Sequence, residues 1–445
     1  MPMLYFLKKL VPKSWFSLYH RSLAVLAASF YGHPSKKLIV IGVTGTNGKT
    51  TVTYLLAKAL EASGFQTGCT STAIIKVGDK EWLNKTKNTM RGRFFLQRTL
   101  ADMVKAGCRY AVIETSSQGL IQSRHIGVAY DVAVFTNLTP EHIEAHGGFE
   151  NYKKAKRVLF DYLATLPSKV VSGQLTEKSA VLNADDEHAD YFAIPGLKQV
   201  WFSRTGKKGM IAEDVAMTDH GSDFRIGDVR VHLALPGAYN IENALAVLAT
   251  CQHLGVDLKA AAEKIAAVSV VPGRFERVEA GQPWTAIVDY APEPESFRRL
   301  YEALQLIPHH RVIHVLGSCG GGRDVARRPI LGQLAAERAD IVIVTNEDPY
   351  DDDPEMIINQ VADGAIAVGK KEGETLYKIV DRREAIFKAM SLAQADDLVV
   401  MTGKGCEPWI CLAQGKKQPW DEVAVAKEAI AAALKKSGEN ATMNA

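Results

Sequence analysis

The sequence predicts an α/β protein with two successive domains, each built around a mostly parallel sheet, behind a short helical N-terminal segment. Its 445 residues exceed what one core accommodates, at roughly 100 to 200 residues per domain. Apolar, β-branched runs alternate with helix-forming stretches along most of the chain. That alternation breaks near Val271-Pro272-Gly273 and then resumes. We therefore expect three parts, at residues 1–35, 36–269 and 270–445.

The N-terminal segment, residues 1–35, is both apolar and cationic. It mixes Lys8, Lys9, Lys13 and Arg21 with Leu4, Phe6, Leu7, Trp15, Phe16, Leu18, Leu23 and Leu26. No apolar run reaches the ~20 residues that span a bilayer, and no small-residue cleavage site follows an apolar core. We expect an amphipathic helix packed on the next domain, in preference to one that contacts a membrane surface.

The central part opens with a strand, a glycine-rich turn and a helix. Leu38 to Val43 is an apolar, largely β-branched run, and a helix-forming stretch extends from Val52 to Ala62. Further buried strands are expected at Tyr110 to Ile113 and Val132 to Phe135, with helical patterns such as Phe95 to Lys105 between strands. This alternation predicts a parallel α/β domain.

A second α/β series follows the break near residue 272. Its expected strands are Ala286 to Val288, Val312 to Leu316, Ile341 to Val344 and Leu398 to Met401. Short apolar runs separated by helical patterns are typical of strands buried between two layers of helices. We expect a Rossmann-like C-terminal domain.

The composition narrows the classes of function. Hydrophobic residues make up 47% of the chain and charged residues 23%, as in soluble globular proteins, and the net charge of +3 gives no reason to expect nucleic acid. The six cysteines contain no C-x-x-C pair, which argues against a zinc ribbon and a disulfide framework. We expect a cytoplasmic, monomeric protein with small-molecule partners.

The turn after the first strand reads Gly45-Thr46-Asn47-Gly48-Lys49-Thr50-Thr51. Glycines let backbone N–H groups turn inward, and a helix N-terminus favours a polyanion. Lys49 would reach the β- and γ-phosphates of a nucleotide, and Thr50 would hold Mg²⁺. The spacing is G-x-x-G-x-x-G-K-T from Gly42, because Val43 occupies the first glycine position of the strict consensus. The central part is therefore predicted to be a P-loop ATPase domain.

Two clusters downstream contain candidate metal ligands. Ile113-Glu114-Thr115-Ser116-Ser117 puts a carboxylate at the end of a buried strand, where it could serve a metal or simply cap a helix. His142 then follows a strand, and Lys156 follows His142. A lone histidine is usually structural, but this order in a chain with a phosphate loop favours a functional role.

The sequence resembles the Mur ligases, because four motifs occur in the order seen in that family: GTNGKTT, ETSS, FTNLTPEHIEAHG and YKKAKRVLF. Within the family, it most resembles the branch that adds the third peptide residue of peptidoglycan precursors. The resemblance implies ATP and two Mg²⁺ ions. It implies that Lys49 binds phosphates, that Thr50 and Glu114 serve one Mg²⁺ and that His142 serves the second. Lys156 corresponds to the lysine that the family carbamylates, which turns a cation into a metal-binding anion.

The resemblance extends through most of the chain. The run LPGAYNIEN, which ends at Asn243, matches the family's G-x-[FY]-N-x-x-N and implies that Asn240 and Asn243 lie near the adenine. Gly273-Arg274-Phe275-Glu276, Asp289-Tyr290-Ala291 and the segment from Gly317 to Pro329 follow the pattern of the mobile C-terminal domain. By that likeness, Arg274 and Asp289 contact the nucleotide when the domains close.

The sequence departs from the family in four places. The family normally carries a uridine-diphosphate-binding domain before its phosphate loop, which here begins at Gly42, so we expect that domain to be missing or replaced by the N-terminal segment. The other departures fall where the incoming amino acid should be read. They are Asp289-Tyr290-Ala291-Pro292 for D-Y-A-H, Gly403-Lys404-Gly405-Cys406-Glu407 for G-K-G-H-E, and Glu347-Asp348-Pro349-Tyr350 for D-N-P-R.

Tyr350 thus replaces the arginine that pairs with the far carboxylate of diaminopimelate, which removes a bidentate clamp. The acidic group of Glu347, Asp348, Asp351, Asp352, Asp353 and Glu407 could favour an amine-ended side chain such as lysine, or could form a solvated loop. We expect lysine or another single-carboxylate amino acid. The expected substrate-binding residues are Ser116, Arg323, Asp348, Tyr350 and Glu407.

The leading hypothesis is an ATP-dependent ligase that activates the carboxylate of a muramoyl-peptide acceptor as an acyl phosphate and joins it to the amine of an amino acid. Folylpolyglutamate synthase, a cyanophycin-type ligase and a subunit that amidates lipid-linked precursors are alternatives. The last usually carries a four-cysteine zinc ribbon, which the sequence lacks. A non-catalytic nucleotide-binding regulator is disfavoured because Lys49, Glu114, His142 and Lys156 are all present.

Overall fold

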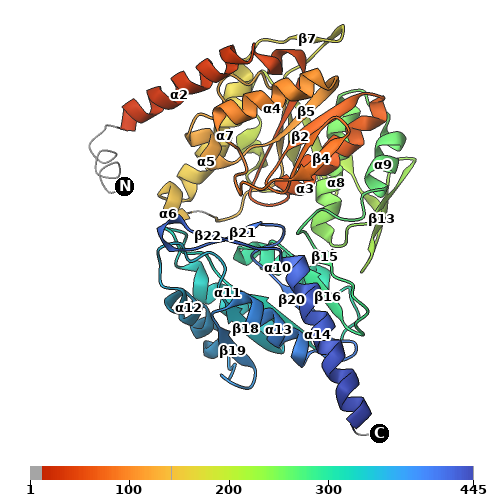
Figure 1. The fold of residues 1–445 in the computed structure, drawn as a ribbon. Helices are drawn as coiled ribbons and strands as arrows, with labels where there is room; N and C mark the ends of the chain where they lie inside the picture. Colours follow the sequence, from red (N-terminus) through yellow and green to blue (C-terminus); the bar gives the residue numbers. More distant parts are fainter. Residues whose placement is uncertain (1–12, 142, 444–445) are drawn as a thin grey trace.

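The computed structural model describes residues 13–141 and 143–443 of the chain. Two α/β bodies lie one above the other in Figure 1, with the N-terminal helix α2 at the outer edge of the first and the C-terminal helix α14 along the second. Each body is built around its own large sheet, so the predicted α/β fold class is confirmed. Within the described ranges, no helix is long and apolar enough to cross a membrane.

The first body contains a sheet of nine described strands in the order β11-β10-β9-β6-β1-β5-β2-β3-β4. Its strands are parallel from β11 to β2, whereas β3 and β4 are antiparallel additions at one edge. The bounds are β1 Ile39–Thr44, β2 Gln66–Thr70, β3 Ile74–Val77, β4 Lys80–Leu83, β5 Cys108–Glu114, β6 Val132–Phe135, β9 Ser179–Asn183, β10 Lys198–Ser203 and β11 Met210–Ile211. The three strands predicted for this part are confirmed as β1, β5 and β6.

Strand β1 lies in the interior of the sheet and is buried along its whole length. Ile39, Ile41 and Val43 belong to a core shared with helices α3 and α8, whereas Val40 belongs to a second core on the opposite face with α4 and α7. Because both faces are covered, the strand is apolar throughout rather than alternating. Its carboxyl end therefore delivers the glycine-rich loop from a fixed position.

Helices cover both faces of the first sheet. They are α3 Lys49–Leu60, α8 Ala238–His253 and α9 Leu258–Ala266 on one face, and α4 Arg93–Lys105, α5 Ser117–Ile121 and α7 Phe149–Thr165 on the other. The short helix α6 Ile143–His146 precedes α7 and contacts the second body. A small antiparallel sheet of β12 Glu213–Thr218, β13 Gly221–Ile226 and β14 Val229–Leu233 precedes α8. Two-residue strands β7 Val170–Val171 and β8 Gln174–Leu175 form a separate hairpin, and short 3₁₀ helices occupy Pro34–Lys37, Glu61–Ser63 and Ala189–Phe192.

The second body contains a six-stranded sheet in the order β15-β16-β20-β17-β18-β19. All neighbours are parallel except β15 and β16. The bounds are β15 Glu276–Arg277, β16 Thr285–Val288, β17 Val312–Leu316, β18 Ile341–Thr345, β19 Leu376–Ile379 and β20 Leu398–Met401. The four predicted strands are therefore confirmed, two of them with the predicted bounds.

Helices of the second body are α10 Pro294–Leu304, α11 Arg327–Arg338, α12 Pro354–Ala367, α13 Arg382–Leu392 and α14 Glu422–Met443. A hairpin of β21 Trp409–Cys411 and β22 Lys417–Pro419, joined through the 3₁₀ turn Ala413–Gly415, follows β20. Helices α11 and α12 cross closely, because a Cβ at Gly332 would lie 1.8 Å from the Val361 carbonyl oxygen and one at Gly364 would lie 1.9 Å from that of Pro329. This crossing fixes the start of α11, which faces the first body.

Helix α2, Lys13–Phe30, packs on α4 through the small residues Ala24, Ala27 and Ala28. The described part of the N-terminal segment is thus a helix that packs on the next part of the chain, as predicted. The boundaries expected at 35/36 and 269/270 stay predictions, although α9 ends at Ala266 and β15 begins at Glu276.

Candidate active site

The glycine-rich loop joins β1 to the N-terminus of α3, as the sequence predicts. Gly45 and Gly48 have positive φ angles of 149° and 82°. A Cβ at Gly45 would lie 1.9 Å from Thr136 Oγ1, and one at Gly48 would lie 2.3 Å from Asn243 Oδ1. Only glycine fits at these two positions, so the backbone of the loop can turn its N–H groups towards an anion at the start of α3.

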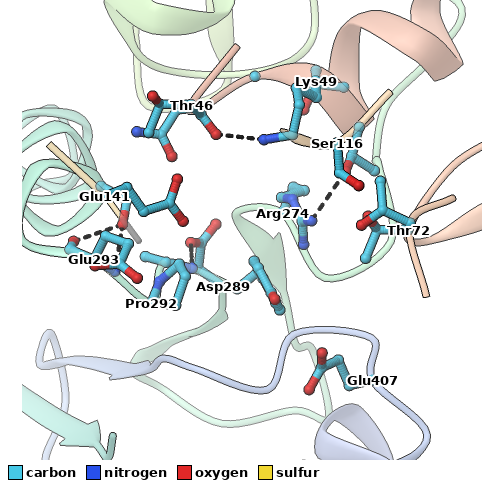
Figure 2. Close-up of a pocket in the computed structure, with 18 of the residues that line it drawn as sticks. Thr46, Lys49, Thr72, Ser116, Glu141, Arg274, Asp289, Pro292, Glu293 and Glu407 are labelled. Carbon is cyan, nitrogen blue, oxygen red and sulfur yellow. Dashed lines mark hydrogen bonds between the residues drawn. The ribbon is translucent and has the colours of Figure 1, made fainter. Parts of the chain in front are cut away.

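Lys49 and Thr50 open helix α3 beside this loop. The Lys49 ammonium donates to the Thr46 carbonyl oxygen at 2.5 Å, as Figure 2 shows. Thr50 Oγ1 donates to Glu114 Oε2 at 3.0 Å, although the two residues come from different elements. Glu114 ends β5 and its side chain is buried. A hydroxyl and a carboxylate held together next to a phosphate loop are the oxygen donors that suit Mg²⁺.

Thr72, which was not predicted as a site residue, also fixes Glu114. Its hydroxyl donates to Glu114 Oε1 at 2.9 Å, and its backbone N–H donates to Oε2 at 2.6 Å. Thr72 follows β2, the strand next to β5 in the sheet. In the sequence, Thr72 is a polar residue just after a buried strand. Its contact with Glu114 could be predicted only with the order of the strands in the sheet, which the sequence does not give.

Lys156 is buried on α7, with 1% of its surface exposed. Its Nζ donates to the Gly45 carbonyl oxygen at 2.5 Å and lies 4.2 Å from the centre of the Tyr152 ring. Burial and the nearby charge of Lys49 lower the pKa of Lys156 well below its ordinary value, and Glu141 only partly opposes them. The Lys156 ammonium therefore loses its proton more readily than that of an ordinary lysine, at the edge of the phosphate loop.

His142, the predicted second metal ligand, lies outside the described residues. The nearby His146 is buried, and its Nε2 lies 3.1 Å from Ser117 Oγ. Its Nδ1 has no hydrogen-bond partner among the described residues. Ser116 caps α5 by accepting from the Gly119 N–H at 3.2 Å, so this predicted substrate residue also has a local structural role.

Asn240 and Asn243 are buried in the first turns of α8. Asn240 Nδ2 donates to the Pro236 carbonyl oxygen at 2.8 Å, and Asn243 Nδ2 donates to Asn240 Oδ1 at 3.0 Å. Since Asn243 Oδ1 stands where a Cβ at Gly48 would be, this pair packs directly against the glycine-rich loop. Its predicted position near an adenine stays a prediction.

Arg274 and Asp289 bring the second body to the loop, as Figure 2 shows. Arg274 Nη2 donates to Thr50 Oγ1 at 3.3 Å. The buried Asp289 carboxylate accepts from the backbone N–H groups of Phe275 and Ala291, each at 2.7 Å. Burial raises the pKa of Asp289, against the opposing charge of Arg274. Asp289 therefore shapes the segment that presents Arg274 to the first body.

The two bodies enclose a cavity of about 500 Å³. It is lined by Thr46, Asn47, Gly48, Lys49, Thr50, Thr51, Glu114, Ser116, Lys156, Asn240, Asn243, Arg274, Asp289, Arg323, Asp348, Tyr350 and Glu407. These are all the described site residues that the sequence predicted except Gly45, which stands behind the loop and accepts from Lys156. The structure thus brings the predicted residues into one place.

Asp348 and Glu407 lie at the end of this cavity formed by the second body. The buried Lys404 ammonium donates to Asp348 Oδ1 at 3.1 Å and to Glu407 Oε2 at 3.0 Å. Lys87, from the first body, contacts Asp348 and lies 2.7 Å from Glu407 Oε2. Burial alone would raise the pKa of Asp348, but Lys404 and Lys87 outweigh it and lower that pKa. The pair of carboxylates therefore binds two primary ammonium groups.

The acidic residues considered above do not all form a solvated loop, so that interpretation is wrong for some of them. Glu347, Asp348 and Glu407 are buried, whereas Asp351 and Asp353 are exposed. Tyr350 is half-buried and adopts a φ of 52°, a backbone conformation that is strained for a side chain of its size. The exposed Arg323 lines the same cavity.

A second carboxylate pair, Glu141 and Glu293, was not predicted. The two side chains lie side by side in Figure 2, and Tyr152 Oη donates to Glu141 Oε2 at 3.1 Å. Arg327 donates to Glu293, which is 3% exposed. Burial and the charge of Glu141 raise the pKa of Glu293 despite Arg327. The sequence marks this pair only indirectly: Glu293 directly follows Pro292, where the sequence departs from the family motif D-Y-A-H.

The fold and the cavity define a P-loop nucleotide-binding protein with a second α/β body closed over its phosphate loop. The family model "Mur ligase middle domain" matches residues 43–251, and "Mur ligase, glutamate ligase domain" matches residues 273–405. This chain belongs to the Mur ligase family. Members of the family are ATP-dependent ligases that form amide bonds, so the predicted class of enzyme is confirmed.

Individual relatives agree with this assignment. A UDP-N-acetylmuramyl-tripeptide synthetase of Roseiflexus sp. (strain RS-1) is 42% identical over 419 residues, which cover 92% of this chain and 82% of the relative. A UDP-N-acetylmuramoyl-L-alanyl-D-glutamate--2,6-diaminopimelate ligase of Geobacillus kaustophilus is 38% identical over the same shares of the two chains. A solved structure of a ligase with the latter name is 31% identical, has a TM-score of 0.58 and covers 89% of this chain and 78% of its own.

Folylpolyglutamate synthase of Mycobacterium tuberculosis, complexed with ADP and AMPPCP, has a TM-score of 0.67 over 87% of this chain and 92% of its own. At 18% identity this likeness shows a shared fold alone. The alternative functions considered from the sequence therefore gain no support from it.

The contact between the two bodies leads to a first prediction. Asp324 accepts from the backbone N–H groups of Ile143 at 3.0 Å and Glu144 at 2.8 Å, and Glu144 Oε1 accepts from the Val325 N–H at 3.1 Å. Asp324→Ala should loosen this contact, since a hydrogen bond to a charged group contributes about 1.5 to 3 kcal/mol. We expect small-angle scattering of the variant with a non-hydrolysable ATP analogue to show a larger radius of gyration than that of the unchanged protein.

Asp257→Ala is the matched control, because Asp257 likewise accepts from a helix N-terminal N–H, that of Ala260 at 2.8 Å, but caps α9. It should leave the scattering profile unchanged. Identical profiles for Asp324→Ala and the unchanged protein would mean that other contacts hold the bodies together.

Proposed function

We propose that this enzyme joins an amino acid with an ammonium-ended side chain to the carboxylate of a muramoyl-peptide acceptor, by way of an acyl phosphate made with ATP. The observation that carries the proposal is a single cavity with a phosphate loop at one end and ammonium-binding carboxylates at the other. The printed names of the relatives, which refer to muramyl-tripeptide synthesis and to diaminopimelate ligation, support the acceptor class.

At the phosphate end, the chain's own residues would bind and neutralise the nucleotide. The N–H groups of the loop and Lys49 would hold the phosphates, while Thr50 and Glu114 would hold one Mg²⁺, which when bound neutralises phosphate oxygens. The 3.0 Å hydrogen bond between Thr50 and Glu114 supports this assignment, because it already places two hard oxygen donors together. Arg274 would then reach the same phosphates from the second body.

Lys156 would supply an anion for a second Mg²⁺, together with His142. Its amine, once deprotonated, would add to CO₂, forming a carbamate and releasing one proton. The lowered pKa of Lys156 supports this step, because a protonated ammonium has no lone pair with which to attack. The resulting negative charge would be compensated by Lys49 and by the metal.

At the other end, Asp348 and Glu407 would bind the side-chain ammonium of the incoming amino acid. The two ammonium groups already held there, those of Lys87 and Lys404, support the choice of ligand chemistry. Two arginines of the second body are already paired within it: Arg327 with Glu293, and Arg328 with Gln360 and Asp352. This favours lysine over diaminopimelate.

The test is an ATP assay with Mg²⁺, panels of acceptors and panels of amino acids, in which phosphate release and product mass are followed together. We expect release that requires both a muramoyl-dipeptide and an amino acid, and none from Lys49→Ala under the same conditions. Release without an acceptor is hydrolysis and does not count. Product formation with a folate or a cyanophycin-type acceptor, and none with muramoyl-peptides, would overturn the proposal.

A further inference from the structure

Helix α2 has its small residues inside and its large apolar residues outside. Ala24, Ala27 and Ala28 are buried against α4 and the segment around Gly127, where a Cβ at Gly127 would lie 2.8 Å from that of Ala28. A surface helix normally points its largest apolar side chains into the core. In α2 the close contact admits only alanine and glycine, so the bulky side chains cannot be there.

The opposite side of the helix, here called the outer face of α2, consists of exposed residues. Its apolar members are Leu18, Tyr19, Val25, Leu26 and Phe30, and Ser22 and Ser29 lie among them. Leu18 is 67% exposed and Phe30 is 73% exposed. Phe94 of α4 is also exposed, and its ring centre lies 6.2 Å from that of Phe30. Several exposed large apolar side chains on one helix face are typical of a contact site.

The charge of the surrounding sequence points to the kind of partner. The chain has 50 acidic residues, yet none occurs before Glu61. The cations of the first 37 residues are Lys8, Lys9, Lys13, Arg21, Lys36 and Lys37. A purely cationic segment that also carries large apolar residues suits an anionic lipid surface, where cations meet the headgroups and apolar side chains enter the boundary with the acyl chains.

Figure 1 shows α2 extending outwards from the edge of the first body. Since no described helix can span a bilayer, contact would be made in the plane of the membrane surface.

We propose that the outer face of α2, with the exposed cations Arg21, Lys36 and Lys37, docks this enzyme on an anionic membrane surface. A second copy of the chain or another protein could also cover an apolar face. Neither accounts for six Lys and Arg residues and no acidic residue in the first 37 positions of the sequence. The docking surface lies on α2 and not on the cavity between the bodies, so its failure would leave the proposed reaction untouched.

The experiment is co-sedimentation of the full chain with vesicles of phosphatidylcholine, alone or mixed with phosphatidylglycerol. We expect binding to the mixed vesicles only, and weaker binding as salt is raised. The variant Leu18→Ser/Leu26→Ser/Phe30→Ser should reduce binding by at least roughly tenfold, and Arg21→Gln/Lys36→Gln/Lys37→Gln should do the same. Because these outer-face side chains are exposed, thermal melting should stay as in the unchanged protein.

The matched control is Val215→Ser/Met217→Ser, which removes two exposed apolar side chains from β12, outside α2. It should bind vesicles like the unchanged protein. A polarity-sensitive dye on Ser22→Cys should also shift its emission to the blue with mixed vesicles. Equal binding by the unchanged protein and the outer-face variant would overturn the proposal. So would a dimer in lipid-free solution that the outer-face variant abolishes, because the face would then belong to a second copy.

Discussion

Lys156→Ala should lower the rate of ligation by at least roughly a thousandfold while the protein keeps its fold. The variant loses the amine that contacts the Gly45 carbonyl oxygen and, under the proposed function, the anion that holds the second Mg²⁺. Truncation to alanine removes one side-chain hydrogen bond and keeps a residue that favours the helix, so the far-ultraviolet circular dichroism should be unchanged. The measurement is the turnover number with saturating ATP, acceptor and amino acid.

Restoration of activity by an added carboxylic acid distinguishes a role of Lys156 as metal ligand from a purely structural role. Acetate or another short-chain acid should restore part of the activity of Lys156→Ala, because it can occupy the space of the carbamate. Lys154→Ala is the control: Lys154 is exposed on the same helix, two residues away, and its loss should change turnover little. Full activity of Lys156→Ala without any added acid would refute the proposed metal role.

Lysine should be incorporated in preference to diaminopimelate by the unchanged enzyme, and Tyr350→Arg should shift that preference towards diaminopimelate by roughly a hundredfold or more. Two or three charge-assisted hydrogen bonds to the far carboxylate, at about 1.5 to 3 kcal/mol each, account for such a shift. The measurement is a competition assay with lysine, ornithine and diaminopimelate at equal concentrations and one muramoyl-dipeptide acceptor.

Tyr350→Phe is the matched control, since it keeps the ring that packs beside Gly321 and adds no charge. Its selectivity should equal that of the unchanged enzyme. Predominant incorporation of diaminopimelate by the unchanged enzyme would contradict the prediction, and would assign the clamp to another cation of the cavity, such as Arg323.

The sequence predicted the buried strands well, because parallel strands covered on both faces are continuous apolar runs. Val132 to Phe135 and Leu398 to Met401 have the predicted bounds for this reason. It did not predict β3, β4 or the small sheet of β12 to β14. All residues of β4 and β12 are exposed, so no apolar pattern marks them.

The predicted site residues were found where a residue type follows a strand or opens a helix, as Lys49 and Glu114 do. Contacts between distant segments gave no such signal. Lys87 meets Asp348 although 261 residues separate them in the sequence. The burial of Glu293 likewise depends on how the second body closes over the first. The local sequence pattern contains no information on how the two bodies are arranged, so the roles of Lys87 and Glu293 could be recognised only in the structure.

Lys87 has a consequence for how an amino acid would enter. It adopts a φ of 59°, and burial alone would lower its pKa, but the charges of Glu407 and Asp348 outweigh burial and raise that pKa. Lys87 is thus a counter-ion of the Asp348 and Glu407 carboxylates that is itself part of the protein chain. Under the proposed function, an incoming ammonium would enter by ion exchange, and only the difference between two chemically similar cations would contribute to its binding.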